Sequence, residues 1–167
     1  MRAALLLICC FLLPFAGKAQ ALEQAHAHWY AGRQSQAIET LDLALRDNPQ
    51  QARWRFTLAW MLQERGELGR AEGLLRALIE DFPDLAEAHN NLAVLLAGRG
   101  DLDAALVALQ RAVQLQPDHV QAQENLGDVL MRMAQRAYLK ATQTAPPRAA
   151  LSLKLRRLSD WLNTTPE

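Results

Sequence analysis

The side chains that could bind a metal or transfer protons are few, and their spacing favours neither role. His26 and His28 are two residues apart, so a helix directs them to different faces, and only Glu23 shares a face with His26. A zinc site needs three or four ligands. Glu124 and Asp128 form a carboxylate pair one helical turn apart, a spacing that is also typical of a solvated helix face. We therefore expect no metal site and no acid–base pair.

Nucleophiles and cofactor motifs are equally scarce in the sequence. Its serines are Ser35, Ser152 and Ser159, and none lies in a Gly-x-Ser-x-Gly motif. The two cysteines, Cys9 and Cys10, are adjacent and close to the N-terminus. The sequence contains no glycine-rich phosphate loop and no Cys-x2-Cys-His haem motif. It predicts a protein that is not an enzyme and that needs no cofactor.

The first 21 residues have the pattern of a secretory signal peptide. Arg2 gives a positive start, residues 3–15 are almost wholly apolar, and Ala19, Gln20 and Ala21 form a small-x-small cleavage site. The apolar run is shorter than the roughly 20 residues that a membrane span needs. We expect cleavage after Ala21 and export, to the periplasm if the cell is Gram-negative. The alternatives are an uncleaved anchor and, on Cys10, a lipoprotein.

Charge and composition narrow the class of partner. The chain has no formal net charge, half of its residues are hydrophobic and 22% are charged, as in an ordinary globular protein. A nucleic-acid-binding domain is usually strongly basic. We therefore expect no nucleic-acid partner and, after signal cleavage, no membrane contact.

A period of 34 residues organises the rest of the chain. Pro49, Pro83 and Pro117 repeat at this step, and so do three glycines and several small or apolar residues: Gly32, Gly66 and Gly100; Ala37, Ala71 and Ala105; Leu41, Leu75 and Leu109; Leu58, Leu92 and Leu126. Such a period predicts stacked helical hairpins rather than a compact enzyme domain. The glycines suit the turn within each hairpin, and the prolines suit the break between hairpins. Asp84 and Glu87 have the spacing of a helix-capping box.

The repeat resembles the tetratricopeptide repeat (TPR). In residues 86–119, Leu92 and Ala93 take the Leu-Gly places, Leu96 the tyrosine place, and Ala105 and Pro117 complete the pattern. The resemblance implies an all-α solenoid of three to four antiparallel helix pairs with a concave groove. The array would cover residues 22–145, with repeats at about 18–51, 52–85, 86–119 and 120–145, the last one degenerate.

The end of the array leaves two possibilities open. Ala134 stands where the period would place the next glycine, so the fourth pair has either a tight turn or one long helix from about 121 to 144. Residues 146–167 begin with two prolines and continue as an amphipathic segment over residues 148–162. We expect a C-terminal capping helix there that covers the apolar face around Leu126 and Leu130.

The resemblance also implies which side chains line the concave groove, because the first helix of each repeat faces it. We expect a partner-binding groove formed by Phe56, Trp60, Asn90, Asn91, Val94, Glu124, Asn125 and Asp128. Asn91 and Asn125 occupy the same place in successive repeats, and an amide can donate to and accept from a peptide backbone. The alternative is that asparagine is simply common at that place. Phe56 and Trp60 would anchor an apolar side chain, or else pack against the first repeat.

One binding mode of the family is not expected. Some members clamp the terminal carboxylate of a partner with lysine and arginine side chains. The corresponding places here include Gln121 and Asn125, with Glu124 and Asp128 beside them. An acidic C-terminal tail would be repelled from these places.

The sequence therefore predicts an exported, non-enzymatic scaffold of the cell envelope that binds a peptide segment of a partner protein. Two alternatives stay open. One is an accessory or enzymatic cell-wall protein with an unrecognised active site, and the other is a constitutive subunit of an envelope assembly. Neither the oligomeric state nor the identity of the partner follows from the sequence.

Overall fold

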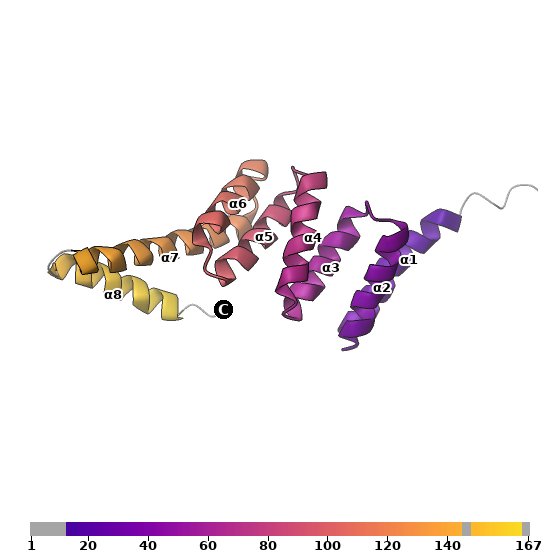
Figure 1. Ribbon diagram of the computed structural model, residues 1–167, viewed down its shortest axis with the longest axis horizontal. Helices are drawn as coiled ribbons and strands as arrows, with labels where there is room; N and C mark the ends of the chain where they lie inside the picture. The colour runs from indigo at the N-terminus through magenta and orange to yellow at the C-terminus, as the bar shows by residue number, and fades with distance from the viewer. Residues whose placement is uncertain (1–12, 145–147, 165–167) are drawn as a thin grey trace, which may run out of the picture. The chain divides into compact units, whose positions relative to one another are not determined.

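The computed structural model describes residues 13–144 and 148–164, and these residues are helical apart from short turns. The helices are α1 (Leu13–Tyr30), α2 (Gln34–Asp47), α3 (Ala52–Glu64), α4 (Leu68–Asp81), α5 (Ala86–Gly98), α6 (Leu102–Leu115), α7 (Val120–Thr144) and α8 (Ala149–Thr164). They are labelled in Figure 1. The prediction of an all-α, hairpin-based fold is confirmed. The chain forms two compact units, Met1–Leu78 and Ile79–Glu167.

The turn within each hairpin depends on a glycine with positive φ. Gly32, Gly66 and Gly100 have φ of 74°, 78° and 87°. Around Gly100, the Gly100 N–H donates to Ala97 O (3.0 Å) and the Asp101 N–H to Leu96 O (2.9 Å), and the same pair of bonds recurs at the other two glycines. These bonds satisfy the last carbonyls of the first helix, and only glycine adopts such a φ without strain.

Small and large apolar residues of the period form the interior of the hairpins. Ala37, Ala71 and Ala105 are wholly buried, and Leu41, Leu75 and Leu109 are at most 1% exposed. An alanine lets the two helices of a hairpin approach closely, and each buried leucine contributes about 1.5–3 kcal/mol through removal from water. The period in the sequence is therefore a packing period.

The fourth pair is a single long helix, which was one of the two sequence-based alternatives. α7 runs for 25 residues without a break at Ala134. Alanine favours helix strongly and opposes the positive φ that ends the first helix of each earlier hairpin. As Figure 1 shows, α7 extends beyond the α5–α6 hairpin and α8 lies back along it.

α8 covers a different part of α7 from the one expected. Gln135 donates to the Ser159 hydroxyl at 3.1 Å, and the Lys154 ammonium lies 5.9 Å from the centre of the Tyr138 ring. Leu130 stays 48% exposed. The expectation that the C-terminal helix covers Leu126 and Leu130 was therefore wrong for Leu130, because α7 continues to Thr144 and α8 contacts its second half, at Gln135 and Tyr138.

One expected helix cap is replaced by another interaction. α5 begins after Leu85 without a side-chain cap, and Asp84 instead accepts a hydrogen bond from Arg111 at 2.9 Å. At α6 the Asp101 carboxylate does accept from the Ala104 N–H, at 3.4 Å. At the start of α7 the ring of His119 accepts from the Ala122 N–H at 3.3 Å.

The expected signal peptide lies only partly within the described residues. Residues 1–12 are outside them, and α1 begins at Leu13 and continues past Ala21, with Leu22 and Ala25 buried. In the part of the chain that the structure describes, no helix combines the length and the apolar character of a membrane span.

Candidate functional site

The structure distributes the expected groove residues over the two units. Phe56 and Trp60 lie on α3, in the first unit. The other six lie in the second unit, on α5 and on the first half of α7: Asn90, Asn91, Val94, Glu124, Asn125 and Asp128.

In the first unit, Trp60 is part of a tryptophan pair. Its ring centre lies 5.1 Å from that of Trp29 on α1, and the two planes are tilted by 52°. This is the packing against the first repeat that the sequence left open as an alternative. Such aromatic contacts contribute about 0.5–1.5 kcal/mol beyond the area that they bury. Trp29, Phe56 and Trp60 are each half-buried, so part of every ring still faces solvent.

In the second unit, three amides form a hydrogen-bonded chain. Asn125 donates through Nδ2 to Asn90 Oδ1 at 2.9 Å, and Asn90 donates through Nδ2 to Asn91 Oδ1 at 3.2 Å. Asn90 is only 4% exposed, whereas the two outer asparagines are half-buried. The chain uses the oxygen of Asn91 and the nitrogen of Asn125. A ligand would therefore meet a donor on Asn91 and an acceptor on Asn125, as a peptide backbone requires.

One apolar side chain and two acidic side chains lie close to this amide chain. Val94 is one turn along α5 from the asparagines and is 36% exposed. Glu124 is exposed and Asp128 half-buried on the first half of α7. This part of the surface therefore offers amide, apolar and carboxylate groups, which suit recognition of a peptide better than they suit catalysis. The described residues contain no group of three or more His, Cys, Asp or Glu side chains that could hold a metal ion.

Ion pairs join elements that are distant in the sequence. Arg70 on α4 contacts Asp42 on α2 and its neighbour Glu67, both at 2.9 Å, and hydrogen bonds to Glu67 and then to Asp42 raise the pKa of Arg70. In the second unit, Arg136 on α7 donates to both carboxylate oxygens of Asp103 on α6, at 2.9 and 3.0 Å. This pair raises the pKa of Arg136 and lowers that of Asp103.

Surface ion pairs of this kind contribute little to stability, but they hold the charged groups in defined positions. The sequence did not predict them. The only signal available to it was opposite charge at separations of 28 to 33 residues, and many other pairs of charged residues in the chain have similar separations.

Two family models, both described as tetratricopeptide repeat, match this chain, one over residues 22–86 and the other over residues 86–119. Together they cover residues 22–119, from the middle of α1 to beyond the end of α6. A search of curated proteins gives no match.

Solved structures of low sequence identity share the fold. The first TPR of Spaghetti (RPAP3), bound to the HSP90 peptide SRMEEVD, is 15% identical, with a TM-score of 0.65 over 70% of this chain and 92% of that chain. The second TPR domain of human RPAP3, in complex with the HSP70 peptide SGPTIEEVD, is 16% identical, with a TM-score of 0.63 over 70% and 97%. YrrB, a TPR protein with an unusual peptide-binding site, is 26% identical, with a TM-score of 0.58 over 62% and 54%.

Proposed function

Because the chain belongs to the tetratricopeptide repeat family, we propose that it is a non-enzymatic scaffold that binds a peptide segment of a partner protein. The observation that carries the proposal is the amide chain of Asn125, Asn90 and Asn91, which presents a donor and an acceptor at places that line the groove in this family. The similar RPAP3 domains hold peptides, which supports the same class of function here.

The half-buried aromatic rings of α3 would supply much of the binding energy. Phe56 and Trp60 present partly exposed rings, and Trp60 is held in place by Trp29. A ring that is already fixed loses little freedom when a ligand covers it. The asparagines would set the direction and register of the peptide rather than the affinity.

The partner proposed here differs from the peptides bound by the RPAP3 domains. Those peptides end in the acidic sequence EEVD. Here Glu124 and Asp128 flank Asn125 on α7, and two carboxylates at this place repel an acidic tail. The segment that contacts the amide chain is therefore neutral or basic.

Single substitutions test the proposal on a partner captured by pull-down from envelope extract. We expect Trp60→Ala to weaken binding by about 2 kcal/mol or more, as truncation of an aromatic anchor does. Asn91→Ala should cost only about 0.5–1.5 kcal/mol, the net value of one hydrogen bond. Tyr30→Ala, which removes a ring that is 80% exposed, is the matched aromatic control and should leave affinity unchanged. The measurement is titration of the captured partner onto each variant.

Thermal unfolding of the same variants shows whether loss of binding follows from loss of structure, since Trp60 also packs on Trp29. Unchanged affinity in both Trp60→Ala and Asn91→Ala, with loss on substitution of Arg76 or Arg111 instead, would move the site to the second helices of the hairpins.

The cell envelope is the proposed location, on the basis of the signal-peptide pattern in residues 1–21. In a Gram-negative cell this means the periplasm. We expect the intact mass of the exported protein to correspond to a chain that begins at Leu22 and contains no cysteine. A mass that retains residues 1–21 would indicate an anchored protein instead.

A further inference from the structure

The second half of α7 lines a hollow of about 610 Å³ within the second unit. One wall comes from the end of α5 and the start of α6, including Gly100 and Leu102, and the other comes from α7. Three cations of α7 line it: Arg132, Arg136 and Lys140. Among the described residues that line the hollow, none is acidic.

These cations continue a row of charges whose sign reverses along α7. Glu124, Asp128, Arg132, Arg136 and Lys140 follow one another at four-residue steps, so they lie along one ridge of the helix. The row extends for about 24 Å, because a helix rises 1.5 Å per residue. It exists only because α7 does not turn at Ala134.

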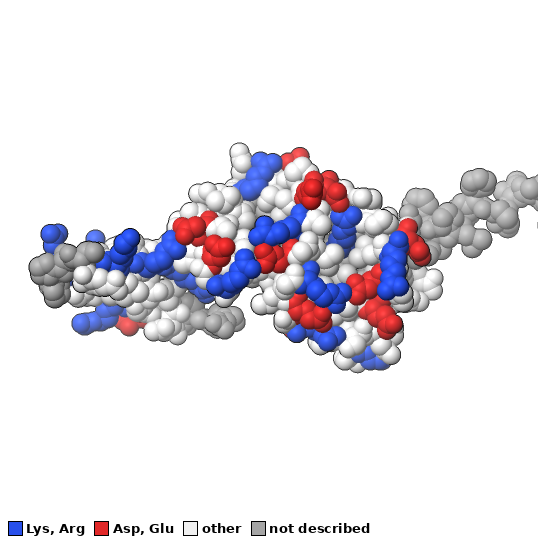
Figure 2. Space-filling view, in the orientation of Figure 1, with Lys and Arg blue, Asp and Glu red and all other residues white. Residues whose placement is uncertain are grey.

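The reversal extends to the whole end of the chain. Residues 22–128 contain nine Lys or Arg side chains against sixteen Asp or Glu, whereas residues 129–167 contain seven against two. Figure 2 shows the Lys and Arg side chains gathered along α7, beyond the region where acidic and basic groups mix. The charge of this part of the surface therefore attracts an acidic ligand.

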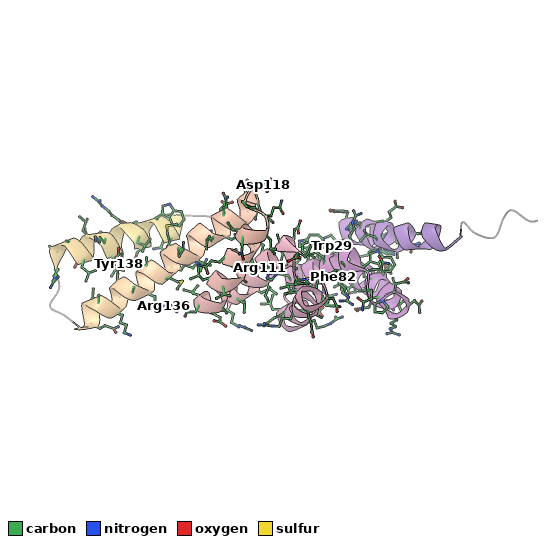
Figure 3. The ribbon with its side chains drawn as sticks, turned by 90° about the horizontal axis from the view of Figure 1, so that it is seen from above. Trp29, Phe82, Arg111, Asp118, Arg136 and Tyr138 are labelled. Atoms are coloured by element: carbon green, nitrogen blue, oxygen red, sulfur yellow. The ribbon has the colours of Figure 1, made fainter. Side chains whose placement is uncertain are left out.

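The hollow also has an apolar component and a fixed cation. Leu139 lines it and is 46% exposed. Arg136 is held by both oxygens of Asp103, yet its side chain is still 52% exposed. In Figure 3, Arg136 lies on the opposite side of α7 from Tyr138, which faces α8. The hollow thus borders the surface that α8 covers: Gln135 lines the hollow and bonds to Ser159 of α8, whereas Arg136 and Leu139 lie on the side away from Tyr138.

We infer that this hollow binds an acidic segment of a partner protein that carries at least one large apolar side chain. The inference rests on the proposed function and adds to it the chemistry and direction of the bound segment. The acidic residues would contact Arg132 and Lys140, the apolar side chain would contact Leu139, and the neutral or basic part would extend toward Glu124 and Asp128. A peptide fits this site better than an anionic bilayer does, because the same ridge of α7 carries Glu124 and Asp128, which would repel such a surface.

A fluorescent peptide of repeated Glu-Glu-Leu triplets, titrated onto the full chain, tests the inference. We expect the double variant Arg132→Glu/Lys140→Glu to weaken binding by about tenfold or more, because two charge-assisted contacts become repulsive. The matched control is Arg156→Glu/Arg157→Glu on α8, which changes net charge equally at two exposed residues outside the hollow. It should change affinity by less than about twofold at physiological salt, where long-range charge effects are screened.

Further titrations, with another peptide, another variant and lipid vesicles, identify the class of ligand. A Lys-Lys-Leu peptide should not bind, and Leu139→Ser should weaken binding of the acidic peptide without changing its salt dependence. Absence of binding by the acidic peptide, or equal loss in the hollow variant and the α8 control, would overturn the inference. Vesicles of phosphatidylglycerol and phosphatidylcholine that bind where the peptide does not would show a lipid surface instead.

The proposed function and this inference can fail separately. If Trp60→Ala and Asn91→Ala weaken capture of the partner but the hollow variant does not, the scaffold function stands and the hollow is not part of the site. If only the hollow variant loses the partner, the hollow carries the binding and the aromatic and amide residues do not.

Discussion

Removal of residues 147–167, which include α8, is expected to lower the melting temperature by about 10 °C and to cause aggregation. One side of α8 carries four half-buried leucines: Leu151, Leu155, Leu158 and Leu162. Removing these leucines, and exposing the apolar surface that they cover, should lower the free energy of unfolding by about 3–5 kcal/mol. Each kcal/mol shifts the melting temperature of a chain this long by about 2–4 °C. The second half of α7 would also lose its main packing partner, and short unsupported helices are marginal in water.

Circular dichroism during heating and light scattering at several protein concentrations measure these effects. Leu153→Ser is the control on α8, since this leucine is 44% exposed and contributes less to the contact with α7. A truncated protein that stays monomeric and equally stable would mean that α8 is not a cap. It would then be a tail or an element that binds a partner.

The positions of the hairpin turns could be predicted from the sequence because they depend on a local property. Gly32, Gly66 and Gly100 each adopt a positive φ, which other residues resist, so the spacing of glycine alone indicates the turns. Ala134 left two possibilities open, because alanine favours a helix but can also occupy a tight turn in which φ stays negative. The long helix that the structure shows then determines where α8 lies, and this consequence could not be foreseen from the period.

The candidate site was predictable only in part, because much of it depends on contacts between different helices. The 34-residue spacing identified Asn91 and Asn125, but the link between them is the buried Asn90, which bonds to a residue 35 positions away. Asp84 has the spacing of a helix cap, yet the structure pairs it with Arg111. The spacing of residues in the sequence cannot show whether Asp84 caps its own helix or pairs with Arg111, because Arg111 comes close to Asp84 only when the helices pack.

Substitution of Ala105 by leucine is expected to destabilise the second unit by about 1–3 kcal/mol. Ala105 on α6 and Ala93 on α5 are both wholly buried in one hairpin, where the helices approach closely. Three additional side-chain carbons have no space there, so the helices must separate or the leucine must adopt a strained rotamer. Because α7 packs on α6 and also contacts α5, a shift within the hairpin would disturb the amide chain and the hollow as well.

Denaturant unfolding of Ala105→Leu beside Gln110→Ala measures this effect against a matched substitution on the same helix. Gln110 is exposed, so its replacement should change the free energy of unfolding by less than about 0.5 kcal/mol. The difference between the two effects depends only on which face of α6 points toward α5. Equal effects of the two substitutions would mean that Ala105 is not at the close contact of the hairpin. The 34-residue period would then reflect something other than packing, because Ala37 and Ala71 occupy the same place in the first unit and are also wholly buried.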